Sequence, residues 1–189
     1  MARTRDTAID EAIVDAALEL LREQGFGAMT VEGVAARAGV GKPAIYRRHP
    51  DKAALAAAAI RTQLPDLEPA DLGDTKAELR RAMDEGFPPD APAYVRLIGG
   101  LIAEEERHPE LIAAFRETIL LPRREVVMAL IRRGQERGDL RRDLDAEAAL
   151  DALAGALLAR VFAGRETGKR WRAAHFETWW SNFESKEER

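Results

Sequence analysis

The sequence contains no cysteine in its 189 residues. This absence excludes a disulfide framework, a thiolate nucleophile and zinc sites with cysteine ligands, and it suits a reducing compartment. The sequence also has no apolar run close to the ~20 residues that a membrane-spanning helix needs. Its N-terminal residues carry charges among their apolar positions, which is unlike a secretory signal peptide. We therefore expect a cytoplasmic protein that has no membrane partner.

The composition favours helices. Hydrophobic residues make up 46% of the chain, which is enough for a packed core, and charged residues make up 33%. Alanine, leucine, arginine and glutamate are abundant, and all four are strong helix formers. Apolar residues recur at helical spacing, and no segment has a convincing strand pattern. The sequence therefore predicts an all-α fold.

The charge of the chain is unevenly distributed. The net charge is −4, yet residues 37–52 hold five basic residues and one acidic residue, Asp51. Residues 66–106, in contrast, hold eleven acidic and four basic residues. A mean charge conceals such local patches, so the short basic segment is a first indication of nucleic-acid contact.

Four helices are predicted before residue 65. Gly25 is a typical position for the end of the first helix, and Thr30 is a good N-cap for the second. Gly39 can adopt the positive φ of a tight turn, and Asp51 is the predicted N-cap of the fourth helix. The four helices are expected at residues 9–25, 31–38, 42–48 and 52–64.

The segment 65–73, which is rich in proline and acidic residues, is predicted to be a linker. It divides the chain into an N-terminal domain, 1–65, and a C-terminal helical domain, 66–189. Pro122 either kinks one long helix of the second domain or separates two. Helices are expected there at about 74–85, 90–106, 109–120, 122–137, 145–163 and 170–184.

Residues 30–48 match a helix-turn-helix: a short helix, a turn carrying glycine, and a basic second helix that would enter the major groove. Tyr46 offers a hydroxyl to a phosphate and a ring to a sugar or a thymine methyl, and the basic side chains can neutralise phosphates. Basic amphipathic segments also occur on ordinary surfaces, so these residues alone leave a solvated hairpin as the alternative. The side chains suited to DNA contact are Lys42, Pro43, Ala44, Tyr46, Arg48 and Lys52.

Residues 39–42, Gly-Val-Gly-Lys, also suggest a phosphate-binding loop. That interpretation fails at both ends of the motif. Ala36 stands where the loop requires its first glycine, and Pro43 stands where a serine or threonine must bind magnesium. We therefore expect no nucleotide or other cofactor.

One family signature covers most of residues 12–55. It consists of Ala16-Ala17, Gly25-Phe26, Met29-Thr30-Val31, Val34-Ala35, Ala38-Gly39-Val40, Ile45-Tyr46 and Lys52. In these residues the segment resembles the DNA-binding domain of the tetracycline-repressor (TetR) family of bacterial transcriptional regulators. The resemblance implies a homodimer, most simply a repressor, that binds a palindromic operator and responds to an unknown small-molecule effector.

The resemblance also implies roles for individual residues. Two positions depart from the usual family pattern. Glu32 is acidic where some members have a basic or backbone-reading residue, and His49 stands where the family usually has Phe or Trp, so we expect His49 to pack rather than to contact DNA. By position, the resemblance implies that Thr30, Tyr46 and Lys52 contact phosphates, that Lys42, Pro43 and Ala44 form the base-facing edge, and that Arg47 and Arg48 lie at its rim.

The C-terminal domain is expected to supply the dimer interface. Residues 145–163 carry a stripe of small side chains that permits close helix approach, and residues 170–184 carry aromatic residues of the kind that concentrate in interfaces. An intramolecular core is the alternative for the aromatic stripe. The predicted interface residues are Ala152, Ala156, Ala159, Trp171, His175, Trp179 and Phe183.

The same domain is expected to hold the effector among its larger apolar residues. For each of these residues, ordinary core packing is the alternative. The candidate effector-pocket residues are Phe87, Tyr94, Leu97, Ile98, Leu101, Phe115 and Phe162.

No catalytic or metal site is predicted. Glu104 and His108 could place two metal ligands on one helical face, but their charged neighbours favour a solvated helix end. No combination of residues resembles a catalytic triad, so an enzyme is not expected. The alternative to a DNA-binding regulator is a helical protein that binds or converts a small molecule. Such a protein would show no salt-sensitive binding to promoter DNA.

Overall fold

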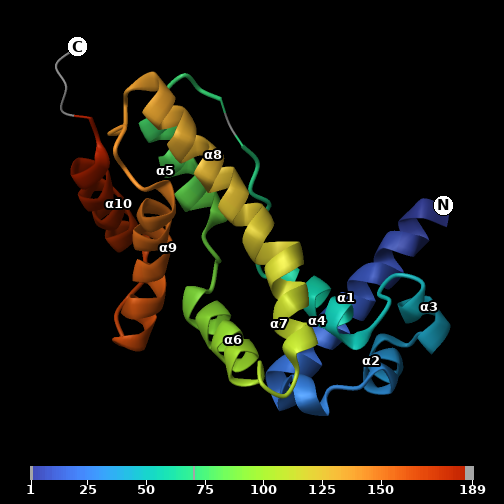
Figure 1. The fold of residues 1–189 in the computed structure, drawn as a ribbon. Helices are drawn as coiled ribbons and strands as arrows, with labels where there is room; N and C mark the ends of the chain where they lie inside the picture. The colour runs from blue at the N-terminus through green and yellow to red at the C-terminus, as the bar shows by residue number, and fades with distance from the viewer. Residues whose placement is uncertain (1, 70, 186–189) are drawn as a thin grey trace. The chain divides into compact units, whose positions relative to one another are not determined.

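The computed structural model describes residues 2–69 and 71–185, and their regular structure is helical (Figure 1). The prediction of an all-α fold is confirmed, since the described residues form no strand beyond one isolated bridge between Leu140 and Glu184. None of the described helices is both long enough and apolar enough to cross a membrane. The elements are α1 (Ala2–Ala28), α2 (Val31–Ala38), α3 (Lys42–Tyr46), α4 (Lys52–Arg61), α5 (Thr75–Gly86), α6 (Ala91–Ala103), α7 (Pro109–Phe115), the π-helical segment η1 (Arg116–Leu120), α8 (Leu121–Arg137), α9 (Ala146–Phe162) and α10 (Lys169–Phe183).

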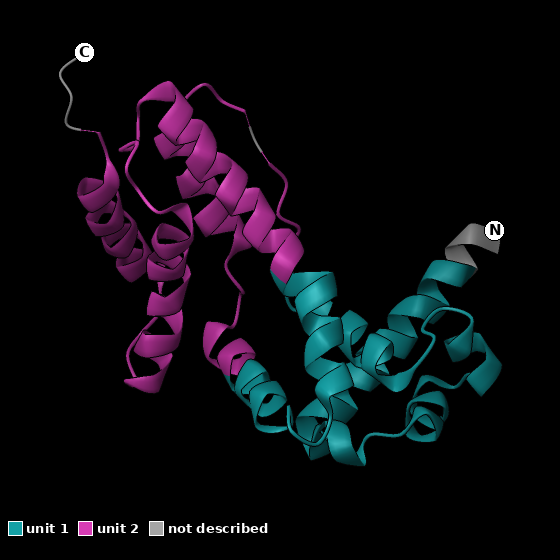
Figure 2. Cartoon of the chain, viewed as in Figure 1, with its two compact units in different colours: residues 1–64, 96–120 teal, residues 65–95, 121–189 magenta. Residues whose placement is uncertain are grey.

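The chain forms two compact units (Figure 2). Unit 1 comprises residues 1–64 and 96–120, and unit 2 comprises residues 65–95 and 121–189. The predicted linker therefore begins at a boundary between the units. The stretch 96–120 packs with the N-terminal helices, although its position after the linker predicts that it belongs to the C-terminal domain.

Unit 1 is built around α1 and α4. Helix α1 packs against both α2 and α4, and α4 also packs against α7 and η1. Ile13, Val34 and Leu55 are buried where these helices meet, as their helical spacing in the sequence suggests. This core holds the helices of the predicted DNA-binding motif in place.

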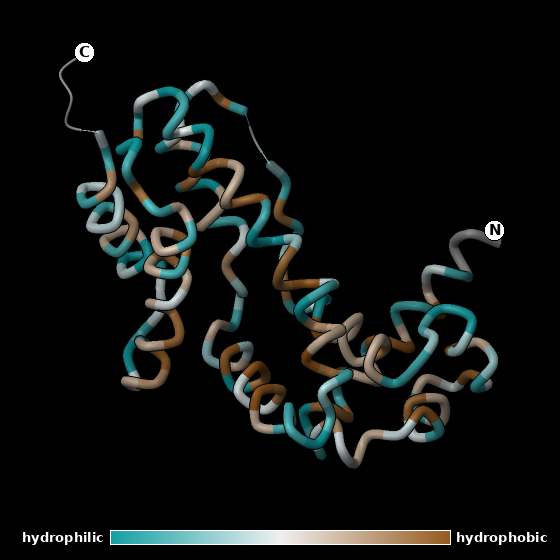
Figure 3. Tube along the Cα trace, viewed as in Figure 1, coloured by the Kyte–Doolittle hydropathy of each residue, from teal (hydrophilic) through white to brown (hydrophobic). Residues whose placement is uncertain are grey.

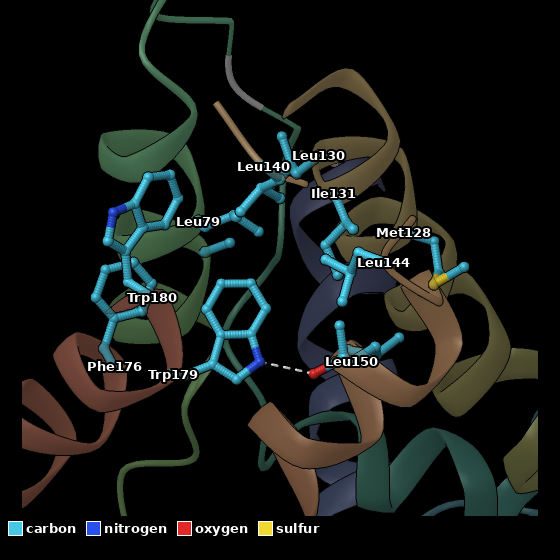
Figure 4. Packing of buried hydrophobic residues seen from close by; sticks show 12 residues of the cluster. Leu79, Met128, Leu130, Ile131, Leu140, Leu144, Leu150, Phe176, Trp179 and Trp180 are labelled. Atoms are coloured by element: carbon cyan, nitrogen blue, oxygen red, sulfur yellow. Dashed lines mark hydrogen bonds between the residues drawn. The ribbon is translucent and has the colours of Figure 1, made fainter. Parts of the chain in front are cut away.

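Unit 2 has its own core, formed where α5, α8, α9 and α10 pack together (Figure 4). Leu79, Ile131 and Phe176 are fully buried in it. The indole of Trp179 points toward α9 and donates a hydrogen bond from Nε1 to the carbonyl of Ala149 at 2.8 Å. The aromatic side chains of α10 are thus largely packed within unit 2 itself.

The helical path through Pro122 is continuous. Helix α7, the segment η1 and helix α8 follow one another without a gap from Pro109 to Arg137. Proline has no N–H to donate to the carbonyl four residues earlier, and the wider π-helical turn ends at Leu120, two positions before it. The structure thereby decides between the two alternatives left open by the sequence: Pro122 does not separate two helices.

Candidate nucleic-acid interface

The predicted helix-turn-helix is formed by α2, the turn after it and α3. The hydroxyl of Thr30 accepts a hydrogen bond from the backbone N–H of Gly33 at 3.0 Å, which caps the start of α2. Gly39 ends α2 in the left-handed conformation, with φ 67° and ψ 32°. Val40 then donates its backbone N–H to the carbonyl of Ala35 at 3.0 Å. The predicted cap and turn are both confirmed.

Helix α3 is anchored on one side and open on the other. Pro43 lies in its first turn, and Ile45 is 1% exposed, so this side chain anchors the helix in the core of unit 1. Tyr46 is 50% exposed, and Lys42, Pro43 and Arg47 are also exposed. Residues three and four apart share one face of a helix, so these four side chains form a common surface, which we call the α3 face.

Lys42 is held by an ion pair. Its Nζ lies 2.8 Å from Oε1 of Glu32, in the first turn of α2. The hydrogen bond from Lys42 lowers the pKa of the Glu32 carboxyl, and the hydrogen bond to Glu32 raises the pKa of the Lys42 ammonium. Both groups are therefore charged at neutral pH.

Arg48 faces inward more than the sequence suggests. It is ion-paired with Asp6 and with Asp10, at 3.5 Å from the latter, and its Nη1 donates to the carbonyl of Ala44 at 2.9 Å. Its side chain is only 16% exposed. The guanidinium therefore ties α1 to the end of α3. The predicted rim contact with DNA would require Arg48 to leave these partners.

Lys52 also has an internal partner. Its Nζ donates to the carbonyl of Phe26 at 3.0 Å and lies 4.1 Å from the centre of the Phe26 ring. The ammonium thus connects the end of α1 to the start of α4. Ala44 is half-buried, and Thr30 is exposed beside its capping hydrogen bond. All eight predicted DNA contacts lie in unit 1.

His49 is buried, as expected for a packing residue. Burial lowers its pKa below the ordinary value of 6.5, the Asp10 carboxylate opposes this shift, and the Arg48 charge reinforces it. The distance from Nε2 of His49 to Oδ1 of Asp10 is 3.7 Å. Sequence reasoning missed Asp6 and Asp10 as partners of this segment, because they lie some 40 residues away and look like ordinary surface residues of α1.

The candidate effector residues are divided between the units. Leu97, Ile98, Leu101 and Phe115 belong to unit 1, and Phe87, Tyr94 and Phe162 belong to unit 2. Leu101 and Phe115 are buried, whereas Phe162 is 82% exposed. The Phe87 ring contacts Trp171 edge-on at 6.4 Å, and burial raises the pKa of Tyr94 to about 12.

A cleft of about 440 Å³ lies within unit 1, between α4, α7 and η1. Its lining includes alanine side chains, such as Ala57 and Ala114, together with the charged side chains of Arg61 and Glu117. None of the seven predicted effector residues lines it. This cleft is therefore a different place from the pocket that the sequence suggested.

The candidate interface residues differ in what they expose. Ala152 and Ala159 are exposed on α9, and Ala156 is half-buried. On α10, Trp171 stacks on His175 at 5.4 Å, and the His175 ring lies 3.0 Å from the carbonyl of Leu153. Trp179 is only 3% exposed, and Phe183 packs against the unit 2 core. Trp179 therefore packs in the core of its own unit, which was the alternative to a dimer contact, and it offers little surface to a partner.

Glu104 and His108 lie 4.0 Å apart in the turn between α6 and α7, and His108 is also 3.3 Å from Glu110. His108 packs edge-on against Phe26, with the ring centres 5.0 Å apart. Within the described ranges, no group of three or more histidine or carboxylate side chains is placed to hold a metal ion. The pair connects the turn after α6 with the end of α1.

Two family models match this chain, and together they span most of it. The model described as "Bacterial regulatory proteins, tetR family" matches residues 13–59, the helices that carry the α3 face. The model described as "Tetracyclin repressor-like, C-terminal domain" matches residues 69–176. Both halves of the chain thus resemble the same kind of protein.

Individual transcriptional regulators are also similar to this chain in sequence and in fold. The HTH-type transcriptional regulator YdeS of Bacillus subtilis is 32% identical over 167 residues, which are 84% of this chain and 81% of the regulator. The crystal structure of the TetR-family regulator SCO0332 has a TM-score of 0.61 and 25% identity, and it covers 92% of this chain and 97% of its own. A TetR regulator from Agrobacterium tumefaciens has the same fold, with a TM-score of 0.65, 24% identity, and coverage of 94% and 95%.

Proposed function

Since the chain belongs to the TetR family of bacterial transcriptional regulators, we propose that it is a ligand-responsive repressor that binds a palindromic operator as a homodimer. In this proposal, α3 is the recognition helix and enters the major groove of each half-site. A bound repressor would block transcription, and a small molecule held by the C-terminal helices would release it.

The α3 face is the observation that carries the proposal. It combines the ammonium of Lys42, the hydroxyl and ring of Tyr46 and the guanidinium of Arg47 on one exposed helical surface. Ammonium and guanidinium groups neutralise phosphates, and a guanidinium can also pair with the major-groove edge of guanine. Pro43 and Ala44 add little bulk, so the backbone of α3 can approach base edges closely.

Because Arg48 and Lys52 have partners within unit 1, we assign them a different role from direct DNA contact. Arg48 acts mainly by tying α1 to α3, and Lys52 acts by closing α1 against α4. Each would then position the recognition helix, while the α3 face and Thr30 contact DNA. A positioning residue is as necessary for affinity as a contact, because a helix that moves loses its base contacts.

We place the homodimer contact on the exposed side of α9. Ala152, Gly155 and Ala159 are exposed there, and a Cβ added at Gly155 would meet nothing within 4 Å. Leu158 is 42% exposed and Phe162 is 82% exposed on the same side. Figure 3 shows hydrophobic residues along this helix. An apolar patch of small residues beside an exposed aromatic ring is suited to helix–helix contact between two copies.

The effector is proposed to bind among the C-terminal helices, near Phe87 and Tyr94. Both side chains are half-buried, and the phenol of Tyr94, whose pKa burial raises to about 12, is protonated at neutral pH. A neutral phenol can donate a hydrogen bond to a ligand carbonyl or hydroxyl. An effector that prefers a conformation with the wrong spacing of the two recognition helices would weaken operator binding.

The proposed function is tested by finding the operator and then changing the α3 face. Genomic DNA retained by the purified protein is sequenced, and the enriched site is used as a fluorescent probe. Tyr46→Ala and Lys42→Ala should each weaken binding by about 10-fold or more, because each removes a contact in both half-sites. Arg81→Ala removes an exposed cation in unit 2 and should leave affinity nearly unchanged. If both α3 variants bound as tightly as the wild type, α3 would not be the recognition helix.

A further inference from the structure

Glu32 is an acidic side chain placed within the proposed DNA-binding surface. It lies in the first turn of α2, and it reaches across the turn to Lys42, ten residues later, at the first position of α3. The Lys42 side chain is 51% exposed and the Glu32 side chain 64% exposed, so the ion pair lies at the surface and not in the core. Tyr46 is close enough to interact electrostatically with Lys42. The pair therefore borders the α3 face.

The surroundings of Glu32 keep its carboxylate charged. The hydrogen bond from Lys42 is the largest cause of its lowered pKa, and a backbone hydrogen bond adds to it. The first turn of a helix also favours a negative charge, because the backbone N–H groups point toward it. Glu32 therefore stays ionised at the pH at which DNA would be bound.

Another ion pair in unit 1 serves as a comparison. Arg37, in α2, pairs with Glu23 at 2.8 Å and with Glu19 at 3.5 Å, both in α1. The distance to Glu23 equals that of the Lys42–Glu32 pair, and all of these side chains are partly exposed. Arg37 is not among the proposed DNA contacts. The Lys42–Glu32 pair differs because it occupies a cation of the recognition helix.

We propose that Glu32 restrains DNA binding by holding Lys42 in an intramolecular ion pair that must open before Lys42 can contact DNA. This inference rests on the proposed function, and it adds a regulating residue to the same surface. Opening the pair leaves the Glu32 carboxylate beside the phosphates, and keeping it closed removes the Lys42 charge from the interface. In both cases Lys42 contributes less to the affinity for DNA than it would without Glu32.

The size of the effect follows from the exposure of the pair. Exposed ion pairs change an equilibrium constant by about 1.5- to 5-fold. A dimer opens two such pairs, so the combined effect on operator affinity is about 2- to 20-fold at low salt. If the charge of Glu32 is removed, Lys42 can neutralise a phosphate without competition. The slope of log affinity against log salt should therefore steepen by up to about 0.9 per half-site.

The test is a double-mutant cycle on the full-length protein with the enriched operator as probe. The four proteins are the wild type, Glu32→Gln, Lys42→Met and the double variant, and circular dichroism confirms that each is folded. Glu32→Gln should tighten binding by about 2- to 20-fold at low salt, and the gain should shrink as salt is added. In the Lys42→Met background, the same substitution should give a distinctly smaller gain. Glu23→Gln removes the same charge from the comparison pair and should leave affinity within about 1.5-fold.

Unchanged or weaker binding by Glu32→Gln would overturn the inference. An equal gain in the presence and absence of Lys42 would also overturn it, since Glu32 would then act on DNA directly. Both outcomes leave the proposed function intact as long as the wild type binds its operator in a salt-sensitive manner. If the wild type showed no such binding, the proposed function itself would fail, and the inference would fail with it.

Discussion

At the scale of single residues, Gly39 determines the turn of the helix-turn-helix. Its φ of 67° is in the left-handed region, which costs other residues about 1 to 2 kcal/mol. A Cβ added at Gly39 would meet nothing within 4 Å, so a substitution there is opposed by the backbone and not by crowding. Gly41, two residues later, has an ordinary φ of −80°.

These two glycines form a matched pair for a stability measurement. Gly39→Ala should lower the free energy of unfolding by about 1 to 2 kcal/mol, because alanine is strained at a positive φ. Gly41→Ala should change it by less than about 0.5 kcal/mol, since its Cβ would make an ordinary contact with Pro43 at 3.5 Å. Urea denaturation of the two variants measures both values. Equal losses in the two variants would show that the turn does not depend on positive φ at Gly39.

His49 should make the stability of the protein depend on pH. Burial lowers the pKa of His49 below 6.5, so the unfolded chain binds the proton more readily than the folded one. The contribution of the neutral ring is present above about pH 6.5, and it is lost as the pH falls from there toward the lower pKa of the folded state. Between about pH 7 and pH 5, denaturant unfolding should show a smaller loss of stability for His49→Phe than for the wild type. Parallel pH profiles for the two proteins would contradict this assignment.

The residue-scale predictions succeeded where the signal was local. Thr30 and Gly39 were identified correctly, because a helix cap and a turn depend on residues a few positions away. The inward orientation of Arg48 was not predictable in the same way. Its partners Asp6 and Asp10 come from another helix, and no spacing rule connects them to the basic segment.

At the scale of elements, the helices from α2 onward agree closely with their periodicity and caps, whereas α1 runs from Ala2 to Ala28 and is longer than the predicted 9–25. Helix α2 matches its predicted bounds, and the later helices begin and end within a few residues of the expected positions. The π-helical segment η1 was missed, although Pro122, two positions after its end, was the available signal. Whether a proline kinks a helix or is absorbed by a wider turn depends on the packing around it, which the sequence pattern does not contain.

The linker is fixed to unit 2 by a buried carboxylate, Glu78 of α5, which is fully buried. Its Oε1 accepts hydrogen bonds from the backbone N–H groups of Leu72 and Gly73, at 2.7 and 3.1 Å. The same carboxylate pairs with Arg137 at 2.9 Å and Arg133 at 3.4 Å, both in α8. Glu78 therefore connects the end of the linker to two helices of unit 2.

Removing the charge of Glu78 should be costly. Glu78→Gln should lower the free energy of unfolding by about 3 kcal/mol, because it leaves two arginines facing a neutral group at a buried site. Glu85→Gln, in the same helix, removes an exposed partner of Arg81 and should cost less than about 0.5 kcal/mol. Chemical denaturation compares the two variants. A cost for Glu78→Gln as small as that of the control would mean that Glu78 does not anchor the linker.

At the scale of the whole molecule, the exposed side of α9 is the proposed contact between the two copies of the homodimer. Phe162→Glu should raise the dissociation constant of the homodimer by at least about tenfold, since it places a charge at the most exposed aromatic ring of the proposed interface. Ala129→Glu introduces the same charge at an exposed position of α8 and serves as the control. Sedimentation velocity over a range of concentrations measures both. A wild-type protein that remains monomeric, or an unchanged Phe162→Glu dimer, would contradict the proposed interface.

The predicted function of the molecule depended more on family resemblance than the predicted fold did. Charge and periodicity identified a basic helix, but they left a solvated hairpin as an alternative. The match of both halves of the chain to TetR family models removes the doubt about its family. The effector residues remain a proposal, because the shape of a ligand pocket depends on packing between distant helices.

The affinity for the enriched operator, compared with a scrambled duplex of the same length and composition, tests the central claim most directly. We predict that the wild type binds the operator at least about 10³-fold more tightly than the scrambled duplex at physiological salt. Affinity for both duplexes should fall as salt rises, and Tyr46→Ala should lose most of the difference between them. Equal affinity for the two duplexes, or discrimination that Tyr46→Ala leaves intact, would contradict sequence-specific binding through α3.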